Sequence, residues 1–327
     1  MLKPISVNDL KIGMHVVLPA SWLEHPFLKN HFNVESQEQI DKIIESSFSE
    51  VIIDTEKSLS KNEPESIVDS HIHISPPEKW EPEKLVPDEL REAIRDKTLN
   101  FGKKAKIVYS CSLRIMERLL EDPKAENISE AKKGIAEIVD LIISDDATAL
   151  SLLSITSYDF STYTHSVNVG VLSVLLSKAL LKNSNAHDMH ELGAGFFLHD
   201  IGKVRLDLGL INKPGKLNDD EMNKIRTHPY QGYKILSETK QLTEECKIVV
   251  LQHHEREDGS GYPNRIKGND IHIYARICSI ADVYDALTAE RSYRQKLNPF
   301  EALKVMKEEL IHHFQRDLFE QFVMLFK

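Results

Sequence analysis

The spacing of apolar residues changes along the chain, and the change divides it into two parts. Near the N-terminus, short runs rich in Val and Ile at residues 14–18 and 51–53 predict β-strands, and the periodic stretch 38–45 after Ser36 predicts a capped helix. After Pro87, apolar residues recur every three or four positions, which predicts helices. The pattern therefore indicates a small α/β unit followed by an all-helical region.

The helical region contains several segments with recognisable start and stop signals. Asp88 can cap a long helix that ends near Asp122, and Ser129 can cap a second helix. Gly202 is the expected stop of another helix. This helix is expected at residues 191–201, and other helices of the region are expected at 164–182, 221–237, 244–255 and 277–289. The predicted fold class is mainly α.

A stretch rich in Glu, Pro, Ser and Lys separates the two parts and predicts an extended linker, because prolines interrupt both helices and ladders. The predicted organisation is a small α/β N-terminal domain at 1–62, a Pro/Glu-rich linker at 63–87, connecting helices at 88–150 and the main helical domain at 151–327. The connecting helices could pack on the main domain or pair two subunits in a homodimer.

Composition and charge narrow the class of protein. A length of 327 residues leaves room for about two domains. The formal net charge of -10 argues against a protein that coats a nucleic-acid polymer, because such proteins rely on excess Lys and Arg. Three widely spaced cysteines fit a reducing compartment, and no apolar run approaches the roughly 20 residues of a spanning helix. We expect a soluble, cytoplasmic protein without membrane insertion.

Side chains that commonly bind metals recur on successive helices of the main domain. They are His165, His199, Asp200, His228, His253, His254 and Asp282. Imidazole and carboxylate groups suit Fe, Mn, Zn or Ni, and the absence of thiolates from the set argues against a structural Cys-type zinc site. A carboxylate such as Asp200 can bridge two ions, and two ions can activate a bridging hydroxide for phosphoryl displacement. The set predicts a binuclear metal centre.

Each of these residues also has a simpler interpretation. A single histidine such as His165 can be a hydrogen-bonded core residue. The adjacent pairs His199-Asp200 and His253-His254 are harder to explain in this way, because polar groups buried without partners are strongly unfavourable. Five other histidines lack such context and are interpreted as surface or structural residues: His187, His190, His272, His312 and His313.

Three cations near these residues could bind a phosphate. Lys203 follows His199-Asp200, although a lysine at a helix end also interacts favourably with the helix dipole. Arg291 and Arg294 are candidate phosphate clamps, because guanidinium binds phosphate bidentately. The tight turn at 258–263 could hold Tyr262 against a base or a partner protein.

Several motifs resemble those of the HD-GYP family, a subgroup of the HD phosphohydrolase superfamily. They are HDIGK at 199–203, HPYQG at 228–232, HHEREDGSGYP at 253–263 and ADVYDALT at 281–288, followed by RSYR at 291–294. In the N-terminal part, LKIGMHV at 10–16 and VIID at 51–54 resemble a small domain of unknown function that often precedes HD-GYP domains. The resemblance implies an HD-type all-helical domain behind a small α/β domain.

The resemblance also implies an activity and roles for single residues. Family members hydrolyse cyclic di-GMP to pGpG, and in many cases on to GMP, with two or three metal ions that are usually iron or manganese; Zn, Ni and Co are alternatives. It implies that the seven side chains are metal ligands, that Asp200 and Lys203 are catalytic, and that Lys203, Arg291 and Arg294 bind substrate. The turn Gly261, Tyr262 and Pro263 is implied to contact partners such as diguanylate cyclase domains.

One departure from the family pattern predicts the number of metal ions. Trinuclear members carry a glutamate four residues before the first ligand histidine, where this chain has Ser161. A serine hydroxyl is a poor ligand, so we predict two ions. On the hypothesis that a third ion favours the second hydrolysis step, we also predict a reaction that stops mostly at pGpG. Two alternatives stay open at this point: hydrolysis of another cyclic dinucleotide or nucleotide, and a non-catalytic receptor or adaptor.

Overall fold

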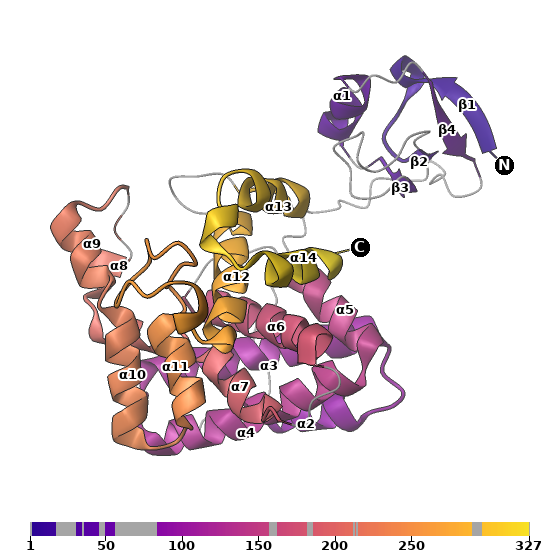
Figure 1. The fold of residues 1–327 in the computed structure, drawn as a ribbon. Helices are drawn as coiled ribbons and strands as arrows, with labels where there is room; N and C mark the ends of the chain where they lie inside the picture. Colours follow the sequence, from indigo (N-terminus) through magenta and orange to yellow (C-terminus); the bar gives the residue numbers. More distant parts are fainter. Residues whose placement is uncertain are drawn as a thin grey trace. The chain divides into compact units, whose positions relative to one another are not determined.

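The computed structural model divides the chain into two compact units, Met1–Ser70 and His71–Lys327 (Figure 1). The residues it describes are 2–17, 31–34, 36–45, 50–55, 84–156, 162–181, 186–211, 213, 215–289 and 296–326. Most of the predicted linker lies outside this set. Ser161, Arg291 and Arg294 also lie outside it, so the predictions made for them stay predictions.

The described residues of the N-terminal unit form a four-stranded antiparallel sheet, an α-helix and the short 3₁₀-helix Val7–Asp9. The strands are β1 (Leu2–Ser6), β2 (His15–Val17), β3 (His31–Asn33) and β4 (Glu50–Asp54), in the order β1-β4-β2-β3. Helix α1 (Gln37–Glu45) begins after Ser36, whose Oγ accepts a hydrogen bond from the Gln39 amide at 3.3 Å. The sequence pattern missed β1, because this strand carries a lysine and a proline and pairs with β4 alone.

The second unit is helical, as the sequence predicts, and Figure 1 shows helix α6 in its interior. Fourteen residues of α6 are buried, so this helix is covered on all sides, and α3, α7 and α12 pack against it. The helices are α2 (Asp88–Arg95), α3 (Phe101–Glu121), α4 (Ala125–Ser144), α5 (Asp146–Ile155), α6 (Thr162–Leu181), α7 (Met189–Phe197), α8 (Leu208–Ile211), α9 (Asp219–Ile225), α10 (His228–Thr239), α11 (Glu244–Gln252), α12 (Ile273–Thr288), α13 (Pro299–Glu308) and α14 (Arg316–Met324).

Helix α6 differs from the expectation that no segment is long and apolar enough to span a membrane. By length and composition it passes that test, but 78% of its most apolar window is buried inside the unit. Burial of that kind is typical of the central helix of a helical protein, because such a helix must be apolar on every face. We therefore describe α6 as a core helix.

The single helix predicted between Asp88 and Asp122 is wrong, because the structure has two helices there. After α2, the carboxylate of Asp96 accepts hydrogen bonds from the amide and the hydroxyl of Thr98, at 2.7 and 2.6 Å. The Oδ1 atom of Asn100 then accepts from the Lys103 amide and caps α3. The proposed caps are also wrong, since Asp88 lies inside α2 and Ser129 lies inside α4.

The helices predicted at 191–201 and 244–255 end earlier than expected, and the one predicted at 221–237 is two helices, α9 and α10. In each case a helix ends just before candidate ligands. Helix α7 ends at Phe197, α9 at Ile225 and α11 at Gln252. Gly202 does not stop a helix; it lies in the 3₁₀-helix Ile201–Arg205 (η2). A Cβ atom on Gly202 would lie 1.9 Å from the carbonyl oxygen of His228, so glycine is required for the close approach of η2 to α10.

Candidate metal centre

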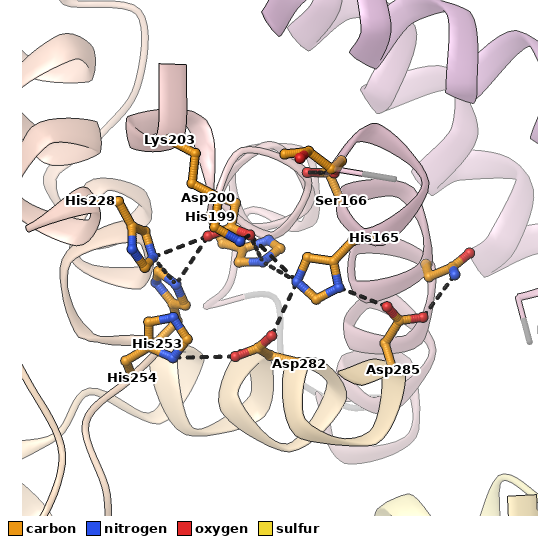
Figure 2. Close-up of polar contacts among 12 residues, drawn as sticks. His165, Ser166, His199, Asp200, Lys203, His228, His253, His254, Asp282 and Asp285 are labelled. Carbon is orange, nitrogen blue, oxygen red and sulfur yellow. Dashed lines mark hydrogen bonds and ion pairs between the residues drawn. The ribbon is translucent and has the colours of Figure 1, made fainter. Parts of the chain in front are cut away.

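The structure brings together the seven side chains that the sequence nominates as metal ligands, and we call them the buried cluster. Two groups can be distinguished, and the ligand atoms within each group lie within 4.8 Å of one another. The first group is Asp200, His228, His253 and His254; the second is His165, His199 and Asp282. Six of the seven are buried and His254 is half-buried. Figure 2 shows all seven pointing toward one another, with Lys203 beside Asp200.

The early helix ends explain how three of the imidazoles are oriented. The last carbonyl groups of a helix have no partner inside the helix. In each case the histidine Nδ1 donates to the carbonyl three residues earlier: His199 to Phe196 at 2.9 Å, His228 to Ile225 at 2.8 Å and His253 to Val250 at 2.9 Å. A carbonyl can only accept, so the ring proton is on Nδ1 and the Nε2 lone pair faces the centre.

The first group fits a divalent cation. The Nε2 atoms of His228 and His253 lie 3.2 Å apart, and Oδ1 of Asp200 lies 3.1 Å from His228 Nε2. Burial lowers the pKa of His228 from its ordinary value, so this ring is neutral. Both Nδ1 atoms already use their protons, and three lone pairs therefore converge on one point. A metal ion would stabilise these facing lone pairs. The Nδ1 protons of His228 and His253 cannot, because they are bound to backbone carbonyls.

Asp200 lies between the two groups. Its Oδ1 atom faces His228, while its Oδ2 atom lies 3.4 Å from His165 Nε2 and 3.5 Å from His199 Nε2. The Lys203 ammonium contacts the same Oδ2 atom. Burial alone would raise the pKa of Asp200, but the Lys203 ammonium holds it well below the ordinary value. The carboxylate is therefore ionised and has one oxygen toward each group.

The second group carries excess negative charge around His165. Its Nε2 atom lies 3.1 Å from Asp282 Oδ1, and its Nδ1 atom lies 2.7 Å from Asp285 Oδ2. Burial would lower the pKa of His165, but these two carboxylates raise it to about 9. Burial lowers the pKa of His199 to about 3, so that ring stays neutral. A cation at this group would balance the buried carboxylates.

A cleft of about 450 Å³ gives access to the buried cluster. Two arginines that the sequence argument did not nominate, Arg226 and Arg256, line it, and so does His313, which was interpreted as surface or structural. Four residues of the buried cluster also line the cleft, together with the neighbouring lysine: His165, His228, His254, Asp282 and Lys203. The nearness of Arg226 to His228 and of Arg256 to His254 in the sequence is the signal that could have identified both arginines.

Of the turn Gly261, Tyr262 and Pro263, the middle residue lines this cleft. The Tyr262 ring centroid lies 4.6 Å from that of His254, and the Arg226 guanidinium lies 5.6 Å from the Tyr262 ring on its face. A Cβ atom on Gly261 would lie 2.5 Å from the His254 carbonyl oxygen, so the turn can pack this closely only with glycine. Tyr262 therefore lies beside the buried cluster, in contact with His254.

Asp285 also belongs to the surroundings of the buried cluster, and the sequence argument missed it. It lies one helical turn after Asp282 on α12, and Figure 2 shows it on the side of His165 away from Asp282. Its carboxylate accepts from the Nδ1 atom of His165 at 2.7 Å. A carboxylate behind a metal-ligating histidine fixes the ring and increases its basicity. Its position three residues after Asp282 was the available signal.

A further group of possible ligands lies elsewhere and is called the surface trio: Asp258, His312 and His313. Their ligand atoms also lie within 4.8 Å of one another. However, the Nη1 atom of Arg256 lies 3.2 Å from the Nε2 atom of His313, so a guanidinium already uses that lone pair. His312 and Asp258 are exposed.

Comparison with known proteins gives consistent results over the whole chain. Residues 114–318 match the HD domain family, and residues 2–140 match a domain of unknown function, DUF3391. The chain is 34% identical to the cyclic di-GMP phosphodiesterase PA4108 of Pseudomonas aeruginosa over 326 residues, which is 99% of this chain and 76% of that protein.

Two further comparisons extend this result. The chain is 41% identical over 124 residues to the 3'3'-cGAMP-specific phosphodiesterase 2 of Vibrio cholerae, which is 38% of this chain and 24% of that protein. Among solved structures, it is similar to Bd1817, an HDG"Y"P protein from Bdellovibrio bacteriovorus, with a TM-score of 0.60 and 18% identity over 98% of each chain. At that identity the structural likeness concerns the fold alone.

Proposed function

The chain belongs to the HD domain family and is a phosphodiesterase, and from this premise we propose that it hydrolyses cyclic di-GMP to pGpG with two divalent metal ions. The observation that carries the proposal is the convergence of seven imidazole and carboxylate groups at the base of one cleft. The similarity to PA4108 over nearly the full length supports the choice of substrate.

The two groups of the buried cluster would each hold one ion. His228, His253 and His254 would bind one, His165, His199 and Asp282 the other, and Asp200 would contact both. Divalent ions at such a pair activate water for attack and neutralise charge on a phosphodiester. The predicted metals are iron or manganese, which the resemblance to the HD-GYP family implies. Imidazoles and carboxylates without thiolates suit both, as they suit Zn and Ni. With Ser161 in place of a third-site glutamate, we propose that the reaction stops mostly at pGpG.

The cations around the cleft are proposed to hold the phosphates of the substrate. Lys203 contacts Asp200 and also lines the cleft, so its ammonium can reach a phosphate oxygen near the ions. Arg226 and Arg256 form no ion pair with any residue that the structure describes. We propose that both face substrate charge, together with Arg291 and Arg294.

Location and partners belong to the same proposal. The substrate is a cytoplasmic messenger in the family this chain resembles, so we propose that the protein acts in the cytoplasm. The turn Gly261, Tyr262 and Pro263 is proposed to contact a signalling partner, such as a diguanylate cyclase domain. The contact would use the side of the turn that does not face His254.

A second candidate substrate is 3'3'-cGAMP. The identity of 41% to a phosphodiesterase that is specific for this dinucleotide favours it, although the match covers 38% of the chain. The two candidates differ by one purine base, so metals and phosphate contacts serve both equally. Competition between cyclic di-GMP and 3'3'-cGAMP in one reaction, with both linear products quantified, decides which is preferred.

The activity is tested by incubating manganese- or iron-loaded protein with cyclic di-GMP under reducing conditions and following pGpG by chromatography. We expect turnover by the wild type and none by a His199→Ala, Asp200→Ala double variant. Absence of turnover by a wild type whose metal content is shown to be complete would contradict the proposal. A receptor or adaptor would keep its cellular effect in the double variant, whereas an enzyme would lose it.

A further inference from the structure

A buried chain of hydrogen bonds leads from the metal centre to helix α3. The Nδ1 atom of His165 donates to Asp285 Oδ2 at 2.7 Å. The other oxygen of Asp285 accepts from Asn168 Nδ2 at 2.7 Å, and Asn168 Oδ1 accepts from the Tyr109 hydroxyl at 2.6 Å. His165, Asn168 and Asp285 are at most 3% exposed and Tyr109 is 5% exposed, so water does not compete with these bonds.

Each bond in this chain fixes the direction of the next one. The Tyr109 hydroxyl donates, so Asn168 must present its carbonyl oxygen to Tyr109 and its amide nitrogen to Asp285. With one oxygen held by Asn168, the carboxylate of Asp285 can turn only its other oxygen toward His165. The orientation of the His165 ring, and therefore the direction of its Nε2 lone pair, depends on all three residues.

Tyr109 differs from the other members in its place along the chain. Asn168 lies one turn after His165 on α6, and Asp285 lies one turn after Asp282 on α12, so both share a helix with a candidate ligand. Tyr109 lies on α3, before the stretch 114–318 that matches the HD domain and within the stretch 2–140 that matches DUF3391. It brings a group from outside the HD match to the metal centre.

We propose that Tyr109 is a positioning residue that sets the metal affinity of the second group, acting through Asn168 and Asp285 on His165. The inference rests on the metal site of the proposed function but not on the identity of the substrate. It gives α3 a role beyond packing: any change in how α3 lies against α6 alters the bond at Asn168 and, through it, the ligand geometry. None of the four residues of the first group takes part in these hydrogen bonds, so metal binding at the first group is not affected.

The test compares Tyr109→Phe with Tyr274→Phe, which is a closely matched control. Tyr274 is also a nearly buried tyrosine, its hydroxyl lies 2.5 Å from His187 Nδ1, and it is on α12 two turns before Asp282. Each variant loses one hydroxyl and with it a hydrogen bond to another side chain, Asn168 for Tyr109 and His187 for Tyr274. Binding of Mn²⁺ to each full-length protein is measured by titration calorimetry, and folding is checked by thermal denaturation.

For Tyr109→Phe we expect one of two Mn²⁺ ions to bind roughly 10-fold more weakly and the other to bind as in the wild type, because changes behind a ligand typically cost 10- to 100-fold in affinity. Tyr274→Phe should bind both ions as the wild type does, with a similar change in melting temperature. In an Asp285→Ala background, Tyr109→Phe should have no further effect on metal binding, since Asp285 carries its influence.

Three results would overturn the inference. One is unchanged affinity for both ions in Tyr109→Phe, and another is an equal loss in both tyrosine variants, which would indicate general destabilisation. A full additional loss in the Asp285→Ala background would show that Tyr109 does not act through Asp285. If the wild type itself binds no Mn²⁺, the proposed metal site is wrong. If the wild type binds Mn²⁺ and one of the three results above is found, only the role of Tyr109 is wrong.

Discussion

The buried cluster and the surface trio contain the same kinds of side chain at the same spacing, yet they differ in what lies behind the ligands. Within each group of the buried cluster, and within the surface trio, the ligand atoms lie within 4.8 Å of one another. In the buried cluster, carbonyl groups at helix ends hold the Nδ1 protons of three histidines, and Asp285 holds that of His165. In the surface trio, the His312 side chain is 56% exposed and Arg256 already donates to His313.

The comparison shows that proximity of histidines and carboxylates does not define a metal centre. An imidazole ligand must also be neutral, oriented and free of a competing cation. Burial and Arg256 lower the pKa of His313 to about 4, so its ring is neutral, but its lone pair is in use. In the buried cluster, burial keeps the rings of His199 and His228 neutral. Backbone carbonyls orient these two rings and that of His253.

The largest effect is expected for Asp200→Asn, which removes the charge between the two groups. The variant should lose tightly bound metal, and kcat for the cyclic dinucleotide should fall on the order of 10³-fold, because the groups that stabilise charge in the reaction are lost together. Metal content per chain and steady-state kinetics measure both. Retention of full metal content would show that Asp200 does not join the two groups.

A large effect on stability is expected for Gly202→Ala. The new Cβ atom would lie 1.9 Å from the carbonyl oxygen of His228, so η2 and α10 must move apart. We expect a loss of about 3 kcal/mol in the free energy of unfolding, as for severe overpacking, together with weaker metal binding at His228. Urea denaturation checks the stability. The exposed Gly215→Ala change is not a suitable control, because Gly215 has a positive φ of 98°.

A smaller effect is expected for Asp285→Ala, which leaves the ligands in place and removes only what lies behind His165. Affinity for one metal ion should fall about 10- to 100-fold while the fold is kept. Competition with a fluorescent chelator measures the affinity of each ion. If both ions were lost together, the two groups would not be separate binding sites.

The smallest effect is expected for His312→Ala, in the surface trio. Metal content and activity should match the wild type, and the free energy of unfolding should change by no more than about 0.5 kcal/mol, because the side chain is exposed. Elemental analysis of the purified variant checks this. Loss of one ion per chain would mean that the surface trio is also a metal site.

Residue types and spacing alone predicted which side chains meet in the buried cluster, because burying seven such groups on successive helices without a metal ion would be strongly unfavourable. Helix limits could not be predicted in the same way. Apolar spacing continues past Phe197, Ile225 and Gln252, whereas the helices end there and carbonyls of their last turns orient the histidines.

The residues behind the ligands were harder to identify. Tyr109 and Asn168 look like ordinary helix positions, and their bond joins residues 59 apart in the sequence. Asp285 contacts a histidine 120 residues away. Such contacts depend on how α3, α6 and α12 pack, which no local pattern encodes.

The most direct test of the buried cluster as a binuclear centre is a calorimetric titration of the wild type and Asp200→Asn with Mn²⁺ under anaerobic, reducing conditions. The wild type should bind two ions per chain at the buried cluster, and the Asp200→Asn variant should bind neither tightly. A wild type that binds one ion or none, or an Asp200→Asn variant that still binds two with unchanged affinity, would contradict it.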